Sequence, residues 1–240
     1  FGEAISDNQV LNLSPFEVQF NENRQFFTEG TELFNKGGLF YSRRIGGTPI
    51  KYWDVEDQVQ EGETLVSNPQ QAKLINATKV SGRTAKGLGL GLFNATSARS
   101  HAVIRNAEGI EREVETDPLT NYTVMVADQN LKNNSFVSLV NTTAWRSGAD
   151  YDANVSAAVF DFRNKGNSWG LRGRGVLSQL YHPGEVDLGH SWNIGVGKIS
   201  GKWQGGLSYS EESDTYNPND LGFLYNNNER SFGAEINYQQ

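Results

Sequence analysis

The chain has 240 residues, no cysteine, 26 glycines, and 21 basic against 28 acidic side chains, for a net charge of -7. Without cysteine it has no disulfides and no thiolate metal site, and its acidic balance argues against nucleic-acid binding, which needs a basic surface. Hydrophobic residues make up 37% and the mean hydropathy is -0.56, and no run approaches the roughly 18 apolar residues that a membrane helix needs. A soluble β-sandwich fits this composition, as does a membrane barrel that is apolar on one face only.

Residues 1–72 form a segment that differs from the rest of the chain. The segment is rich in charge, contains Pro49 and Pro69, and alternates between apolar and polar residues only locally, at 16–20 and 39–45. Because such short patterns do not define a series of strands, we expect the segment to precede the main β-domain. We predict that it either packs inside that domain or adds early strands to it.

Residues 73–240 read as a meander of about nine strands. The expected strands cover 73–83, 87–105, 119–130, 135–146, 152–163, 168–181, 190–199, 202–211 and 230–240. Apolar and polar residues alternate along them, and successive side chains of a strand point to opposite faces. In 168–181 the alternation places Trp169, Leu171 and Leu177 on one face, and Arg172 and Arg174 on the other.

The connections between these strands alternate in length. Residues 84–86, 131–134, 164–167 and 200–201 are short, whereas 106–118, 147–151, 182–189 and 212–229 are longer. Outer-membrane barrels have short periplasmic turns and longer extracellular loops, a regularity that Greek-key sandwiches do not require. We therefore predict an all-β fold, an antiparallel transmembrane β-barrel of the outer-membrane type. Residues 106–118, 182–189 and 212–229 should lie on the extracellular side.

The expected strand number and the end of the chain predict a fragment of a larger barrel. Nine strands do not close the even-numbered antiparallel barrel of the usual bacterial kind, and an unpaired edge in lipid costs several kcal/mol per backbone group. The last strand stops in mid-pattern, so we expect further strands after residue 240. The start, Phe1-Gly2-Glu3-Ala4, has no leader sequence and is expected to lie inside a longer protein or to follow processing.

Energetics assign the two faces. An arginine on the lipid face at the bilayer midplane costs about 2–4 kcal/mol, so Arg172 and Arg174 should face the lumen. In the last strand the same alternation predicts that Glu235 and Asn237 face the lumen, and that Phe232, Ile236 and Tyr238 face lipid. The basic residues of the wall either favour anionic solutes or neutralise acidic residues of the first segment, and the sequence leaves both possibilities open.

Six charged residues of the first segment are candidate lumen charges: Glu17, Glu22, Arg24, Glu29, Arg43 and Arg44. They could line a constriction or contact a ligand. They could equally form ion pairs that hold the segment to the barrel wall, and we favour this interpretation because enclosed charges need partners. Glu22 and Glu29 could act as a glycosidase pair only at a fixed separation across a sugar, which the sequence does not establish.

Two loops contain possible metal ligands. His182-Pro-Gly-Glu-Val-Asp-Leu-Gly-His190 has two imidazoles and two carboxylates, but its spacing matches no familiar zinc motif. Residues 214–220 are rich in oxygen ligands yet lack the glycine and glutamate of an EF-hand loop. No catalytic triad, phosphate loop or dinucleotide motif is present. We predict no catalytic residue, no metal ligand and no cofactor.

Several motifs carry a family resemblance. Leu11-Asn-Leu-Ser-Pro-Phe-Glu-Val-Gln-Phe20, Glu22-Asn-Arg-Gln-Phe-Phe-Thr-Glu-Gly30, Leu39-Phe-Tyr-Ser-Arg-Arg-Ile-Gly46, Lys79-Val-Ser-Gly-Arg83 and Gly89-Leu-Gly-Leu-Phe-Asn-Ala95 resemble the Bacteroidota outer-membrane family called domain of unknown function 5916. This chain departs from the family pattern at Asn21 and Gln25, where proline is usual. The resemblance implies an outer-membrane barrel without an established reaction, and a preceding carbohydrate-binding-like domain that is absent here.

The predicted function is that of a non-enzymatic channel or a component of an outer-membrane assembly in the bacterial cell outer membrane. The alternative is a barrel that anchors a carbohydrate-binding or carbohydrate-active surface protein. The expected partners are outer-membrane lipid, and other outer-membrane proteins or glycans, but no nucleic acid. The solute, the total number of strands and whether the lumen is open or filled are left open by the sequence.

Overall fold

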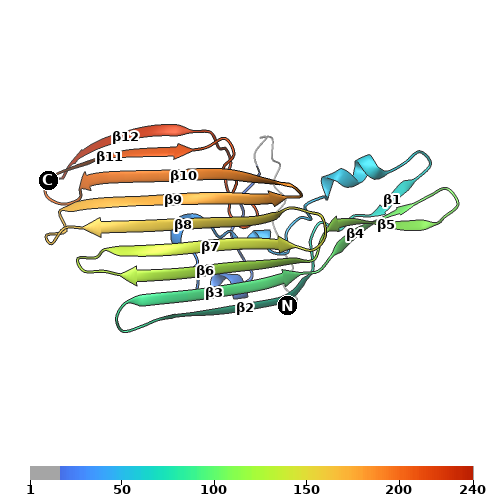
Figure 1. Cartoon of the computed structure of the whole chain (residues 1–240), viewed down its shortest axis with the longest axis horizontal. Coiled ribbons are helices and arrows are strands. Elements are labelled where there is room, and N and C mark those ends of the chain that lie inside the picture. Colours follow the sequence, from blue (N-terminus) through green and yellow to red (C-terminus); the bar gives the residue numbers. More distant parts are fainter. Residues whose placement is uncertain (1–16, 240) are drawn as a thin grey trace.

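The computed structural model describes residues 17–239, whose regular secondary structure consists mainly of antiparallel strands (Figure 1). Short helices precede them: α1 Gln25–Thr28 and the 3₁₀ helices η1 Lys36–Gly38, η2 Ser42–Arg44 and η3 Trp53–Gln58. The strands are β1 Thr64–Ser67, β2 Leu74–Arg83, β3 Leu88–Ser97, β4 Ser100–Arg105, β5 Glu111–Asp117, β6 Thr120–Asn130, β7 Phe136–Arg146, β8 Asp152–Arg163, β9 Trp169–His182, β10 Glu185–Lys198, β11 Trp203–Glu212 and β12 Arg230–Tyr238. Within the described part, no helix is both long enough and apolar enough to cross a membrane.

The main sheet has nine strands in the order β12-β11-β10-β9-β8-β7-β6-β3-β2, and every pair in it is antiparallel. The all-β antiparallel prediction is therefore confirmed. The closed barrel is not, because β2 and β12 do not pair with each other within residues 17–239, and the sheet is open. Residues 1–16 of the expected first segment, and Gln240 of the last expected strand, lie outside the described residues.

A second sheet corrects the prediction for 87–118. The expected single strand 87–105 divides at Ala98, whose N–H donates to the carbonyl of Lys73 at 2.7 Å. Beyond this point β4 leaves the main sheet and pairs with β1 and β5, because Ala102 and Ile104 pack against Val55 in a core of their own. The expected loop 106–118 thus contains β5, and this small sheet extends from one end of the main sheet (Figure 1).

The expected long loop 182–189 is also wrong. The strands β9 and β10 pair up to His182 and Glu185, which leaves only Pro183 and Gly184 as the turn. Gly184 has a φ of +87°, the left-handed conformation that a type II turn needs after a proline and that glycine adopts without strain. A motif rich in turn residues therefore closes a hairpin here.

The earlier half of the described first segment packs against one face of the main sheet, whereas β1 belongs to the small sheet. Residues 17–47, which we call the inner segment, bury Phe27, Leu33, Phe34, Leu39 and Ile45 against that face. The sheet residues in this core include Phe93, Val124, Val140, Val155 and Val176. The face that the inner segment covers is called the inner face below, and the opposite one the outer face.

The inner face of β3 has glycines where the inner segment approaches. A Cβ on Gly89 would lie 3.0 Å from Leu33, and one on Gly91 would lie 3.1 Å from Phe34. Either contact is tighter than side chains normally allow, so these strand glycines make room for the apolar side chains of the inner segment.

Along β9 and β12 the side chains divide between two faces with the predicted alternation. Arg174 donates to the carbonyl of Gly37 in the inner segment, which places Arg172 and Arg174 on the inner face. On the outer face Leu171 pairs with Val196, which in turn pairs with Leu207, and Leu171 is 37% exposed there. On β12 the register places Glu235 and Asn237 on the inner face, and Phe232, Ile236 and Tyr238 on the outer face.

The turns 84–87, 131–135, 164–168 and 199–202 gather at one end of the main sheet (Figure 1). The small sheet, the turn at 183–184 and the loop 213–229 lie at the other end, which we call the mouth. The loop 213–229 folds back over the inner face, where its Tyr216 and Leu221 are buried in the main core. Gly189 permits this approach, because a Cβ there would lie 2.4 Å from the carbonyl oxygen of Thr215.

Candidate functional site

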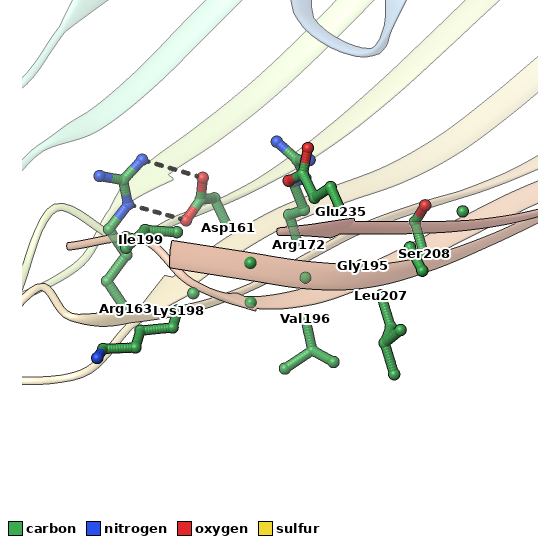
Figure 2. Close-up of a pocket in the computed structure, with 16 residues that line it drawn as sticks. Asp161, Arg163, Arg172, Gly195, Val196, Lys198, Ile199, Leu207, Ser208 and Glu235 are labelled. Atoms are coloured by element: carbon green, nitrogen blue, oxygen red, sulfur yellow. Dashed lines mark hydrogen bonds and ion pairs between the residues drawn. The ribbon is translucent and has the colours of Figure 1, made fainter. Parts of the chain in front are cut away.

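The inner face of β8–β12 contains a basin that the inner segment leaves uncovered (Figure 2). Its volume is about 360 Å³, within the usual range of small-molecule pockets. Its charged side chains are Asp161 and Arg163 on β8, Arg172 on β9 and Glu235 on β12. Lys198, Val196 and Leu207 belong to the same wall but point away from these charges, toward the outer face (Figure 2).

The floor of the basin is made of glycines. Gly195 and Gly197 on β10, Gly206 on β11 and Gly233 on β12 all fall on the inner face. A Cβ on Gly195 would lie 3.5 Å from Nε of Arg172, and one on Gly206 would lie 3.7 Å from Oε1 of Glu235. The arginine therefore extends over β10 and the glutamate over β11, across a floor that carries no side chains there.

The charges are distributed unevenly around the basin. Arg163 holds Asp161 through Nε at 3.2 Å and Nη2 at 3.4 Å. Among the described residues, neither Arg172 nor Glu235 forms a hydrogen bond or an ion pair with another side chain. The β8–β9 side thus has two guanidinium groups and one carboxylate, whereas the β12 side has one carboxylate. The basin is dipolar, with its positive side toward β9.

Glu22 and Arg24, two of the predicted lumen charges, form an ion pair with each other inside the inner segment. Arg24 binds the Glu22 carboxylate through Nε at 2.9 Å and Nη2 at 2.8 Å, and donates to the carbonyls of Ile45 and Ser42. Burial raises the pKa of Glu22, but hydrogen bonds from Arg24 and Ser42 outweigh it and lower the pKa to about 2. The Arg24 guanidinium also lies 4.0 Å above the Phe27 ring.

The other four predicted charges of the inner segment also form hydrogen bonds or ion pairs with residues of that segment. Arg43 donates to the carbonyl of Asn21, and Arg44 forms a two-bond ion pair with Glu17, at 2.9 and 2.8 Å. Glu29 accepts a hydrogen bond from Gln25 at 2.7 Å. The structure does not bring these residues into the basin of Figure 2. Of the predicted lumen charges, only Arg172 lines it, while Arg174 lies beside it under Gly37.

Apart from the bond of Arg174 to Gly37, further ties between the inner segment and the sheet come from residues that were not among the predicted lumen charges. Lys79 on β2 donates to the carbonyl of Phe26 at 2.6 Å and to that of Glu29. Asp128, fully buried on β6, binds Arg83 at 2.6 Å and Lys36 of the inner segment at 3.5 Å. The sequence does contain a signal for Asp128: in the expected strand 119–130 its carboxylate falls on the same face as Val124 and Val126.

A second buried cluster joins the two sheets near the mouth. Asp220 of the loop 213–229 binds Arg146 of β7 and accepts a hydrogen bond from Tyr151 at 3.0 Å. Nearby, Asp117 at the end of β5 is 3% exposed and accepts a hydrogen bond from the N–H of Ile50 at 3.3 Å. Burial raises the pKa of Asp117 to about 6, against the lowering effects of that hydrogen bond and of Arg146.

The candidate metal ligands of the mouth do not all converge: His182 lies 3.3 Å from Asp187, but the second histidine is remote from both. His182 lies on the inner face of β9, whereas His190 on β10 pairs with Leu177 and faces outward. Over residues 17–239 no group of three or more histidine, aspartate and glutamate side chains is arranged to hold a metal ion.

The fold and the basin define an all-β protein with a two-faced antiparallel sheet and an inner segment packed on it. The chain belongs to the family described as domain of unknown function (DUF5916), whose model matches residues 1–240, as the motifs of the inner segment and of β2–β3 predicted. No curated protein and no solved structure matches the chain.

Proposed function

We propose that the nine-stranded sheet is the wall of an outer-membrane β-barrel, and that the protein is a channel whose lumen is partly filled by the inner segment. The observation that carries the proposal is the inverted polarity of β10–β12. The outer face of β12 exposes Phe232 and Ile236, 72% and 75% accessible, while its inner face has polar residues and glycine. In water the hydrophobic effect would favour burial of the apolar face, whereas lipid outside and water inside favour this arrangement.

Aromatic pairs on the outer face support a membrane position. Trp203 and Tyr238, with ring centroids 4.7 Å apart, lie near the turn end of the sheet. Trp192 and Tyr209, 4.9 Å apart, lie farther toward the mouth. Between the two pairs the outer face is aliphatic, with Val196, Leu207, Ala234 and Ile236. Two aromatic girdles flanking an apolar band are typical of membrane barrels.

On the mouth side of this band the outer face becomes polar. On β3 and β6, Asn94 donates to Asn121 at 3.0 Å and to Thr123 at 2.9 Å. On β7 and β8, Asn141 donates to Ser156 at 2.9 Å. On β11 and β12 the corresponding polar group is the ion pair of Glu211 with Arg230, at 3.0 Å.

This polar border crosses the strands obliquely. A line drawn straight across the sheet from Glu211 on β11, from one paired residue to the next, reaches Leu90 on β3. The polar group on β3 is at Asn94, four residues (from 90 to 94) farther from the turns than this line. Over six strand-to-strand steps this corresponds to an inclination of about 25°, at about 3.3 Å per residue and about 4.8 Å per strand. Strands of a barrel are tilted in a flat bilayer, so an oblique border supports the proposal, although Val186 and Leu188 on β10 are apolar beyond it.

The lumen in this proposal has two parts. The inner segment covers the valine-rich inner face of the main-sheet strands β2, β3 and β6 to β9. Lys79, Asp128 and Arg174 of these strands bond to it. Along β10–β12 the inner face is lined by glycine, serine and asparagine, and it stays open at the basin. A solute would pass along this polar side of the lumen.

Reconstitution of the full-length protein into planar bilayers tests the proposal. Stable unit conductance, together with heat-modifiable migration of the detergent-extracted protein on a gel, is the expected result. A folded monomer that is soluble without detergent and forms no conducting unit would overturn it.

A further inference from the structure

We propose that the basin on β8–β12 binds zwitterionic solutes, free amino acids or short peptides, with the solute carboxylate on Arg172 and its ammonium group on Glu235. The inference rests on the proposed function, because it names the class of solute that this part of the lumen would take. It also describes a binding equilibrium that can be measured without any conductance.

The first argument is the availability of the two charges. The cross-strand neighbour of Arg172 is Asp161, but Arg163 already occupies that carboxylate with two hydrogen bonds. The Arg172 guanidinium, which binds a carboxylate with two parallel hydrogen bonds, is thus left for a ligand. Glu235 has no partner among the described residues, and its carboxylate can accept from an ammonium group.

The second argument is the shape of the floor between the charges. Arg172 starts from β9 and Glu235 from β12, and between these strands lie β10 and β11, whose inner face has glycines at the basin. Larger side chains at Gly195 or Gly206 would occupy the space that Arg172 and Glu235 enter. Among the described residues the two charged groups do not form an ion pair with each other, which leaves each of them to bind one end of a ligand that carries both charges.

The third argument concerns selectivity. A ligand with only one charge would satisfy one of the two groups and leave the other with water, whereas a zwitterion satisfies both. Opposite charges placed at two sides of a site also orient a dipolar solute and disfavour the reverse orientation. A basin of about 360 Å³ suits a solute the size of an amino acid or a short peptide.

Isothermal titration of the full-length protein in detergent with three peptides tests the inference. The peptides are triglycine with free termini, N-acetyl-triglycine and triglycine amide, which differ mainly in terminal charge. Triglycine should bind, and each capped peptide should bind at least tenfold more weakly. The variants Arg172→Gln and Glu235→Gln should each weaken triglycine binding at least tenfold. Lys198→Gln, which removes a charge from the outer face of the same wall, should leave it unchanged.

A charge-exchange variant keeps the test independent of net charge. Arg172→Glu combined with Glu235→Arg retains both charges and should bind triglycine within about threefold of the natural protein, whereas either reversal alone should not bind. Heat-modifiable gel migration identifies variants that fold. Absence of triglycine binding, or equal binding of the capped peptides, would overturn the inference. Conductance without triglycine binding would refute the inference alone, and binding without conductance would refute the channel alone.

Discussion

At the scale of single residues, Arg24 connects more of the inner segment than its position just before the short helix α1 suggests. It bonds to the Glu22 carboxylate and to two backbone carbonyls, and it stacks on Phe27. Both side chains of the pair are largely enclosed, at 7% and 13% exposure. Loss of one partner of such a pair leaves an uncompensated charge, which is costly.

We predict that Arg24→Met lowers the free energy of unfolding by about 3–5 kcal/mol. Urea unfolding in detergent micelles measures the loss, and limited proteolysis should show faster cleavage within residues 17–47. The double variant Arg24→Met with Glu22→Met should recover part of the loss, because no unpaired carboxylate remains. Glu61→Gln, at an exposed position, is the control. An unchanged unfolding midpoint in Arg24→Met would show that this pair does not hold the inner segment.

Asp117 gives the protein a pH dependence of known sign. Its pKa is raised from 3.8 to about 6 in the folded protein, so the folded state binds the proton more tightly than the unfolded state does. This contribution to stability is fully present below about pH 4 and is lost as the pH rises through about 6. A shift of about two pH units corresponds to about 2–3 kcal/mol.

The variant Asp117→Asn should therefore be more stable than the natural protein at pH 8, by up to about 2–3 kcal/mol, and should lose the slope between pH 4 and pH 6. Unfolding curves recorded at pH 4, 5, 6, 7 and 8 measure the effect, with Asp57→Asn at an exposed position as the control. A variant that is less stable than the natural protein at pH 8 would mean that the carboxylate is favourably bound.

Single residues were the least predictable part of the molecule. Parity along a strand correctly assigned Arg172 and Glu235 to one face, because alternation is local. The partners of those residues depend on strands that are far apart in sequence. Asp128 meets Arg83 and Lys36 only after β2, β6 and the inner segment come together, and no spacing in the sequence encodes that meeting.

At the scale of elements, the contact between the inner segment and β3 is the most specific. Phe93 is 1% exposed, and its ring lies within 5.2–6.3 Å of the rings of Phe26, Phe27, Phe34 and Phe40. Four of these five aromatic residues belong to the inner segment. Their packing, together with the glycines of β3, holds the segment against the sheet.

We predict that Phe93→Ala destabilises the protein by about 3–5 kcal/mol, the usual range for a buried phenylalanine. Its neighbour Leu92 points to the outer face and is 49% exposed, so Leu92→Ala should change stability by less than about 1 kcal/mol in detergent. Urea unfolding of both variants makes the comparison. Equal effects at the two positions would contradict the assignment of faces on β3.

The elements divide into those that the sequence predicts and those that it does not. Residues 120–130, 136–146 and 152–163 form uninterrupted strands of the main sheet, and the expected boundaries there differ from the structure by one residue at most. The break at Ala98 escapes the pattern, because alternation continues through β4 while its partner strands change. The turn at 183–184 escapes it as well, because polar residues extend both strands of a hairpin beyond the apolar part.

At the scale of the whole molecule, the two faces of the main sheet have opposite characters. One face has the inner segment, the folded loop 213–229 and a polar basin, and the other is apolar between aromatic pairs. The sequence predicted the all-β class from alternation, but not the open sheet or the small second sheet, since strand pairing between distant segments is not a local property. The inverted polarity of β10–β12 is the feature from which the proposed function follows.

The most direct test of that feature is the accessibility of spin labels along β11 in the full-length protein reconstituted into lipid vesicles. Single labels at Gly206, Leu207, Ser208 and Tyr209 are exposed in turn to oxygen, which concentrates in lipid, and to a water-soluble nickel reagent. We predict oxygen maxima at Leu207 and Tyr209 and nickel maxima at Gly206 and Ser208, with opposite phase. Nickel maxima at Leu207 and Tyr209, or accessibility without alternation, would contradict the assignment of the outer face to lipid.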